Sequence, residues 1–97
     1  MDDGRTSTVT LHCLCPLHGR LDLTSGDDAE QYRLTAGELT AVLQGGRIEL
    51  ANGELKCAIH HEDDVIWFSF FGGIPAEFSL APEHFAILCR SLGFEGV

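Results

Sequence analysis

Apolar and polar residues alternate on both sides of Asn52-Gly53, and this pattern predicts a β-hairpin. Residues 47–51 and 54–59 carry apolar side chains at every second position, which is the period of a strand with one buried face. Asn-Gly is also the pair that best supplies the two positive-φ positions of a type I′ turn. If these two residues form the loop, the expected cross-strand pairs are Leu50 with Leu55 and Ile48 with Cys57 on the apolar side, and Glu49 with Lys56 on the other.

Two further segments extend this hairpin into a predicted meander. The second strand runs into the polar turn His60–Asp64 and then into the aromatic run Val65–Phe71. Gly72–Pro75 has turn residues, and a fourth strand follows with Ala76, Phe78 and Leu80 on the apolar side. With Glu62-Asp63 as the loop, the expected pairs are Ile59 with Ile66, Cys57 with Phe68 and Leu55 with Phe70. We therefore predict a four-stranded antiparallel meander over about residues 47–80.

Two segments have the period and the end signals of helices. Thr35 and Glu38 have the Thr-x-x-Glu spacing of a capping box, and apolar residues follow at helical spacing as far as Gly45-Gly46. Pro82 suits the first position of a second helix, because the N–H that proline lacks has no partner there, and Gly93 suits its C-terminal cap. The apolar stripe of the second helix is Phe85, Leu88, Cys89 and Leu92. We predict helices over about residues 35–44 and 82–92.

The N-terminal part of the chain predicts a second, smaller hairpin. Its expected strands are Thr8–Cys15 and Arg20–Thr24, joined around Pro16–Gly19, and the acidic stretch Ser25–Glu30 is expected to be a loop. Residues 1–7 are expected to be a flexible end. The predicted fold class is therefore α+β: a mainly antiparallel sheet, made of this hairpin and the meander, with two helices on its apolar face. The 97 residues are enough for a single small domain, 1–97.

The net charge narrows the range of partners. Six Lys and Arg residues against fifteen Asp and Glu residues give a formal net charge of −9 at pH 7. This balance argues against direct binding to nucleic acid, whose affinity comes from basic side chains on phosphates, and against docking on anionic membranes. A distributed acidic surface mainly serves solubility. The alternative interpretation is an inhibitor that mimics a nucleic-acid backbone and occupies the basic groove of a DNA- or RNA-binding protein.

The sequence predicts a cytoplasmic protein with reduced thiols. Residues 1–6 lack the basic region and apolar run of an export signal. The longest apolar stretch, Val65–Phe71, is far shorter than the about 20 residues that a membrane-spanning helix needs. Four cysteines without an export signal are typical of reduced thiols. Cys13 and Cys15 lie on the same side of any strand, so we expect no disulfide between them.

Two Cys-x-x-His pairs raise the question of a metal. Cys15 and His18 flank a proline-containing turn, Cys57 and His60 form the second pair, and these four residues could form a closed Cys₂His₂ zinc site. Strand alternation argues against it, because Cys57 shares a face with Leu55 whereas His60 falls on the other face. The leading interpretation is buried thiols and solvated turn histidines, without any cofactor. A small zinc-stabilised domain is the alternative.

The aromatic strand carries the clearest functional signal. No grouping of acid, base and nucleophile and no phosphate-binding loop is recognisable, so we predict no enzymatic activity and no catalytic residue. Val65, Trp67 and Phe71 alternate with core-facing residues, so the opposite face of the sheet also shows large apolar groups. Either the N-terminal hairpin covers them, or they form a homodimer interface or a docking surface for a partner protein, where Trp is a frequent anchor.

The predicted function is therefore a non-catalytic protein-interaction domain of a regulatory or inhibitor type. It would bind a partner protein through an acidic surface and an aromatic strand face. The predicted contact residues are Val65, Trp67, Phe71, Glu62, Asp63 and Asp64.

Overall fold

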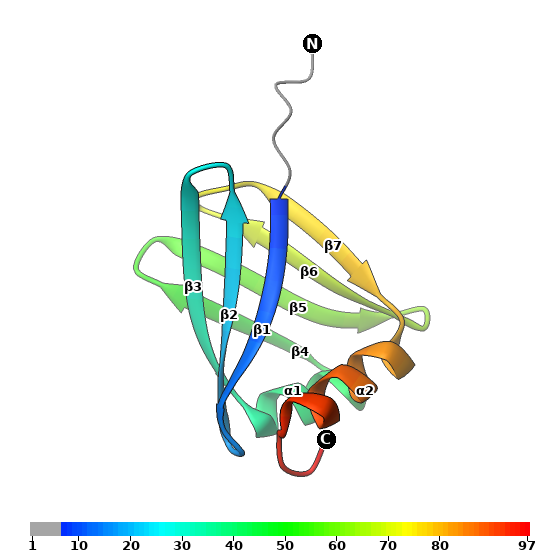
Figure 1. Cartoon of the computed structure of the whole chain (residues 1–97). Helices are drawn as coiled ribbons and strands as arrows, with labels where there is room; N and C mark the ends of the chain where they lie inside the picture. Colours follow the sequence, from blue (N-terminus) through cyan, green and yellow to red (C-terminus); the bar gives the residue numbers. More distant parts are fainter. Residues whose placement is uncertain (1–6) are drawn as a thin grey trace.

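A computed structural model describes residues 7–97 as two antiparallel sheets, each followed by a helix (Figure 1). The first half contains β1 (Ser7–Cys15), β2 (His18–Ser25), β3 (Asp28–Thr35) and α1 (Ala36–Leu43). The second half contains β4 (Arg47–Asn52), β5 (Leu55–Glu62), β6 (Val65–Phe71), β7 (Ala76–Leu80) and α2 (Pro82–Leu92). Strands lie side by side in sequence order within each sheet. The predicted α+β fold with a four-stranded meander is confirmed.

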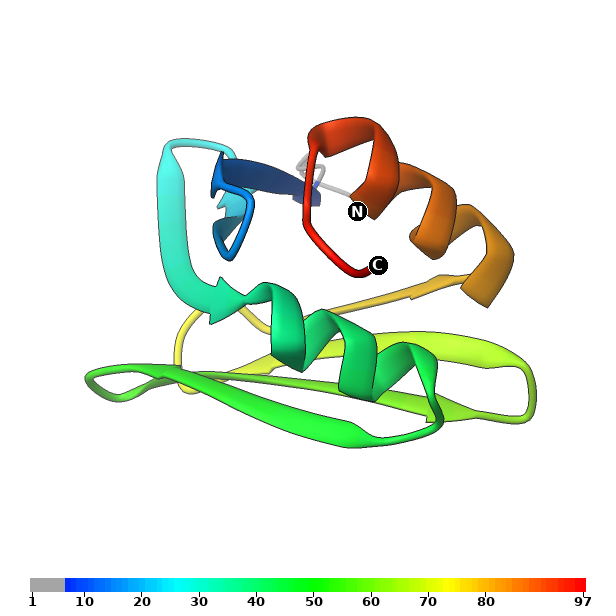
Figure 2. The ribbon, with the colours of Figure 1, turned by 90° about the horizontal axis from the view of Figure 1, so that it is seen from below.

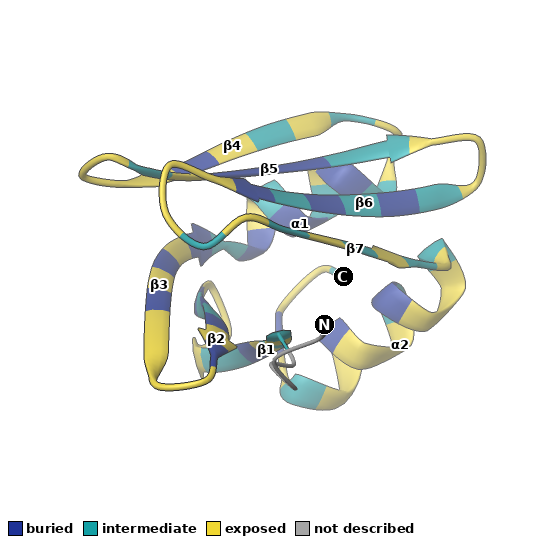
Figure 3. Cartoon of the chain, turned by 90° about the horizontal axis from the view of Figure 1, so that it is seen from above, coloured by how far each residue is buried: buried dark blue, intermediate teal, exposed yellow. Residues whose placement is uncertain are grey.

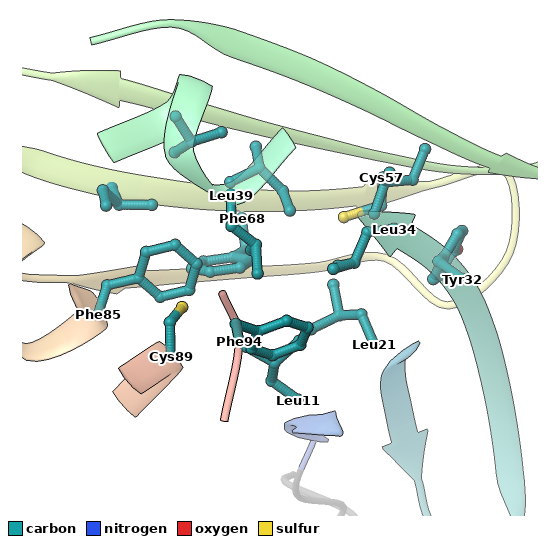
Figure 4. Close-up of a cluster of buried hydrophobic side chains, with 14 of the residues drawn as sticks. Leu11, Leu21, Tyr32, Leu34, Leu39, Cys57, Phe68, Phe85, Cys89 and Phe94 are labelled. Atoms are coloured by element: carbon teal, nitrogen blue, oxygen red, sulfur yellow. The ribbon is translucent and has the colours of Figure 1, made fainter. Parts of the chain in front are cut away.

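Both helices and the three-stranded sheet lie on the same side of the four-stranded sheet (Figure 2). One buried cluster joins apolar side chains from both sheets and both helices (Figure 4). Phe68 of β6 meets Phe85 of α2 edge to face, with ring centroids 5.6 Å apart. Tyr32 of β3 meets Phe70 of β6 at 5.7 Å. The core is therefore shared between the two halves of the chain, and each half buries its apolar face against the other.

The helix ends agree with the signals in the sequence. The Thr35 hydroxyl accepts a hydrogen bond from the Glu38 N–H at 3.2 Å, and the Glu38 carboxylate accepts one from the Thr35 N–H at 2.9 Å. Pro82 opens α2, and Gly93 ends it with a φ of 104°, a left-handed conformation that favours glycine. The predicted apolar stripe needs one correction, because Leu88 is 40% exposed.

One strand, β3, was not predicted from the sequence. The stretch Ser25–Glu30 was predicted as a loop, but β2 ends at Ser25 and β3 begins at Asp28, so only a two-residue turn lies between them. β3 points Glu30 inward together with Tyr32 and Leu34, so a charged residue at a buried position hides the alternation. The loop between β1 and β2 is also shorter than the expected Pro16–Gly19, because Cys15 pairs directly with His18. Of the predicted flexible end, residues 1–6 lie outside the described residues and Ser7 begins β1.

The register of the meander differs from the prediction by two residues. Leu50 pairs with Cys57, and Ile59 pairs with Phe68. The first loop is Gly53-Glu54, where Gly53 alone has a positive φ, 65°; a type II′ turn needs a positive φ only at its first central residue. The second loop is Asp63-Asp64, with φ values of 51° and 62°, which Asp tolerates better than most residues. A shift of two preserves every face, so the predicted inward and outward sides are correct.

Candidate functional site

The aromatic residues of β6 divide between the two faces of the four-stranded sheet. Ile66, Phe68 and Phe70 are buried in the shared core. Val65 and Trp67 lie on the opposite, outer face and are partly exposed, and Phe71, on the same face, is 47% exposed. The three-stranded sheet packs on the inner side, so the N-terminal hairpin does not cover this outer face (Figure 3). Of the two alternatives that the sequence left open, covering by the hairpin is therefore wrong.

A shallow hollow of about 380 Å³ lies around Trp67 on the outer face. It is lined by His60, Glu62, Asp63, Val65, Trp67 and Glu77. The strand register explains this grouping. His60 of β5 and Ser79 of β7 lie directly opposite Trp67, one on each side. Glu77, two residues before Ser79, is the diagonal neighbour of Trp67, a distance that a large aromatic side chain can span.

The hollow carries more negative than positive charge. Three carboxylates line it, from Glu62, Asp63 and Glu77, and no lysine or arginine does. His60 is held beside one of them, with Nε2 3.4 Å from the Glu62 Oε2 atom. The other ring nitrogen, Nδ1, is shielded from solvent and has no hydrogen-bond partner in the described part of the chain. An indole flanked by carboxylates attracts cations, because the ring face and the acidic oxygens are both negative.

Four of the six predicted contact residues converge on this hollow. Glu62, Asp63, Val65 and Trp67 line it, and Asp64 is the next residue in the same tight turn. Phe71 does not belong to it: it lies four residues along β6 from Trp67, about 13 Å at the rise of a strand, and pairs with Lys56.

Two residues of the hollow, His60 and Glu77, are not among the contact residues predicted from the sequence. The sequence places His60 in the polar turn and among the candidate zinc ligands, and it indicates no role for Glu77. Strand alternation could have found both. Phe78 and Leu80 point inward, so Glu77 must point outward, and His60 is in phase with Glu62 on the outer side of β5.

The structure does not bring the four predicted zinc ligands together. Cys15 and His18 are exposed at the end of the first hairpin. Cys57 is fully buried in the core, where burial raises its pKa from 9.0 to about 12, and His60 lies on the other face of β5. Within residues 7–97, no group of three or more His, Cys, Asp and Glu residues is arranged to hold a metal ion. The zinc alternative remains a prediction without geometric support.

The contacts of His61 and the buried Cys89 thiol are structural. His61 Nδ1 lies 3.1 Å from the Val42 carbonyl oxygen at the end of α1, where an imidazole N–H can satisfy a helix C-terminal carbonyl. All four cysteines are free thiols. Burial raises the pKa of Cys89 from 9.0 to about 11. A buried thiol with a raised pKa is a poor nucleophile, because the thiolate is the reactive form.

A buried carboxylate links the two halves of the chain. Glu30 of β3 accepts a hydrogen bond from the Tyr32 hydroxyl at 2.8 Å, and its second oxygen accepts one from the backbone N–H of Ile74, in the turn before β7. Burial, and then the bond to Glu30, raise the pKa of Tyr32 above its ordinary value. Both oxygens of this carboxylate are occupied by structural partners, so we assign Glu30 to the fold.

No protein-family model matches the chain, and no curated protein or solved structure is significantly similar to it. Within the described residues, neither helix is long and apolar enough to cross a membrane. The function must therefore be argued from the surface itself.

Proposed function

We propose that this chain is a non-catalytic interaction domain that binds a basic segment of a partner protein on the outer face of its four-stranded sheet. The observation that carries the proposal is the hollow around Trp67, a partly exposed indole with three carboxylates around it. Its location on a sheet face that the other described elements leave open makes it accessible in a single copy of the chain.

The apolar part of the surface supplies the contact area. Val65, Trp67 and Phe71 lie along one strand on the outer face. Large apolar side chains that a fold leaves partly exposed on one face are candidates for an interaction surface. Tryptophan is enriched among the residues that dominate binding energy, because it buries a large rigid area and still offers an N–H donor.

The charge distribution determines the kind of partner. Arginine suits this hollow, since its flat guanidinium stacks on an indole and donates paired hydrogen bonds to carboxylates. The net charge of −9 adds a long-range attraction for basic surfaces and accelerates their encounter. A second copy of the chain carries the same negative charge, so a homodimer through this face is disfavoured. A cytoplasmic location, where the free thiols stay reduced, forms part of the proposal.

Trp67 is the only tryptophan of the chain, so its fluorescence reports directly on the hollow. The first test titrates the protein with an acetylated, amidated Gly-Arg-Gly-Arg-Gly peptide. We expect a saturable change in Trp67 emission that weakens as salt is added. Asp63→Lys combined with Glu77→Lys should weaken the binding at least tenfold. Asp27→Lys combined with Asp28→Lys, the same charge change at exposed positions where the turn after β2 leads into β3, is the matched control and should change the binding less than twofold.

The second test identifies the partner by differential capture from the source cells. The baits are the wild-type chain, Trp67→Ala with Asp63→Lys, and Asp28→Lys, which makes the same charge change at an exposed position. Bound proteins are quantified by mass spectrometry. A basic protein depleted at least tenfold only on the double variant supports the proposal. Equal capture by all three baits, together with no saturable response of Trp67 to the arginine peptide, would remove this face from consideration.

A further inference from the structure

A second surface lies between the two sheets, on the opposite side of β6 from Trp67. It is an apolar groove of about 250 Å³. Its walls come from Val9 and Leu11 of β1, Phe78 and Leu80 of β7, and Phe85 and Leu88 of α2. The one polar residue of the lining is Ser79, whose side chain lies on the outer face of β7, opposite Trp67. Figure 4 shows Leu11, Phe68 and Phe85 pointing into the space between the sheets.

The groove is closed at one end and open at the other. Beyond α2, the Glu95 N–H donates a 2.8 Å hydrogen bond to the Pro16 carbonyl, and Gly93 lies beside the Cys13 thiol. These contacts hold the C-terminal end of α2 against the C-terminal end of β1. The lining residues of β1 precede this junction, and Leu88 at the rim is 40% exposed. The groove therefore opens along the first half of β1.

The wall formed by β1 is an unpaired strand edge. β1 pairs only with β2, so the backbone N–H and C=O groups on its other side have no strand partner. Sheet edges are usually protected by charged side chains, proline or short length. β1 is nine residues long and contains no proline, Asp, Glu, Lys or Arg. The other edge strands of the described sheets all carry charges: β3, β4 and the short β7.

We propose that this groove binds an extended apolar segment of another protein, which adds a strand to β1 and inserts a side chain between β1 and α2. Strand addition combines two sources of binding energy: main-chain hydrogen bonds along the edge, and a pocket that selects a side chain. An apolar cavity of about 150 Å³ holds benzene, so the larger groove accepts a side chain the size of leucine or phenylalanine. This site is separate from the outer face around Trp67.

The surroundings of the groove favour a single extended chain over a second copy of this protein. α2 and β7 form its far wall, so the space beside β1 is bounded on both sides. A second copy would bring its own β2 alongside its β1, because the two are paired. Two copies would also each carry a net charge of −9, and their repulsion opposes association. A segment without acidic residues meets neither obstacle.

The test selects a phage library of random nine-residue peptides on the biotinylated full chain. We expect enriched sequences with apolar residues at alternate positions. A synthetic peptide of this kind should bind at least tenfold more weakly to Leu88→Glu, and also more weakly to Leu88→Gln, which adds no charge. The matched control is Ile87→Glu on the same helix, which is 55% exposed and outside the groove and should change the affinity less than twofold. Hydrogen exchange of the β1 amides should slow when the peptide is bound.

Three results would overturn this proposal. The library could yield no enrichment over an unrelated protein. Binding could be weakened by Trp67→Ala and not by Leu88→Glu, which would place the peptide on the outer face and leave only the proposed function standing. The chain alone could form a concentration-dependent dimer with its β1 amides already protected, which would make a second copy the occupant.

Discussion

The outer faces of the two sheets differ sharply, although both border solvent in a single copy of the chain. On the three-stranded sheet, the outward positions are mostly polar: Thr8, Thr10, His12, Arg20, Asp22, Thr24, Gln31 and Arg33. Leu14, near the end of β1, is a large apolar exception and is 54% exposed. Asp22 is the centre of a small charge cluster there, accepting from Arg20 at 2.8 Å and lying 3.1 Å from His12 Nε2. On the four-stranded sheet, the outward positions of β6 include Val65, Trp67 and Phe71.

This difference distinguishes the side chains that form the core from those on the outer face of β6, which the core does not include. The three-stranded sheet has the usual pattern of an antiparallel sheet with one buried face, apolar inward and polar outward. The inner face of the four-stranded sheet already fills the core, so the fold does not require the aromatic residues on its outer face. The proposed function assigns them to contact with a partner protein.

The largest difference in unfolding free energy should separate two phenylalanines on opposite faces of β6. Phe68→Ala removes a core ring that packs on Phe85 and should cost about 3–5 kcal/mol of unfolding free energy. Phe71→Ala removes a ring that is 47% exposed and should cost less than about 1 kcal/mol. Urea unfolding of both variants measures the difference. Equal losses would mean that the outer face is packed and not free for a partner.

A smaller loss is expected where Glu30 links the sheets. Glu30→Ala leaves the Tyr32 hydroxyl and the Ile74 N–H without their shared acceptor, which should cost about 2–3 kcal/mol. The neighbouring Gln31→Ala, exposed on the outer face of the same strand, should change stability by less than about 0.5 kcal/mol. Thermal unfolding of both variants provides the comparison. A Glu30→Ala protein as stable as Gln31→Ala would show that the carboxylate does not hold the halves together.

Alkaline pH should lower the stability of the fold through the two buried thiols on the inner side of the sheets. The pKa of Cys57 is raised to about 12 and that of Cys89 to about 11, so both stay protonated in the folded chain while they ionise above about pH 9 in the unfolded chain. Their contribution is therefore fully present below pH 9 and declines as the pH rises towards 11 and 12. We expect Tm to fall between pH 9 and pH 11.

Two cysteine variants test this origin of the pH dependence. Cys57→Ala should reduce the fall in Tm, because the buried thiol no longer titrates differently in the two states. Cys15→Ala, at the exposed end of the first hairpin, should leave the fall unchanged. Identical pH profiles for the wild type and Cys57→Ala would contradict the assignment to this thiol.

The smallest effect is expected on the polar outer face. Arg20→Gln removes a charge partner of Asp22 from a surface position and should cost no more than about 1 kcal/mol. It should leave the response of Trp67 to the arginine peptide unchanged, since Arg20 lies on the other sheet. A weakened response in this variant would mean that the two outer faces act together.

Most of the candidate site was predictable from strand alternation. The outward direction of Trp67 and Val65 and their nearness to the acidic turn depend only on the period of two along β6 and on the turn that joins it to β5. The convergence of Glu77 from β7 required the register across three strands. The groove between β1 and α2 was not predictable at all, because its walls come from residues far apart in the sequence.

The sequence by itself determined which side chains face inward in the meander, where both helices begin and end, and the α+β class. These features depend on residues within a few positions of one another, through alternation, capping and turn preferences. Only the tertiary structure decided the register, the third strand that contains Glu30, and the face that the first sheet covers. A register shift of two leaves the alternation unchanged, a charged inward residue hides a strand, and covering depends on how two distant apolar faces pack together.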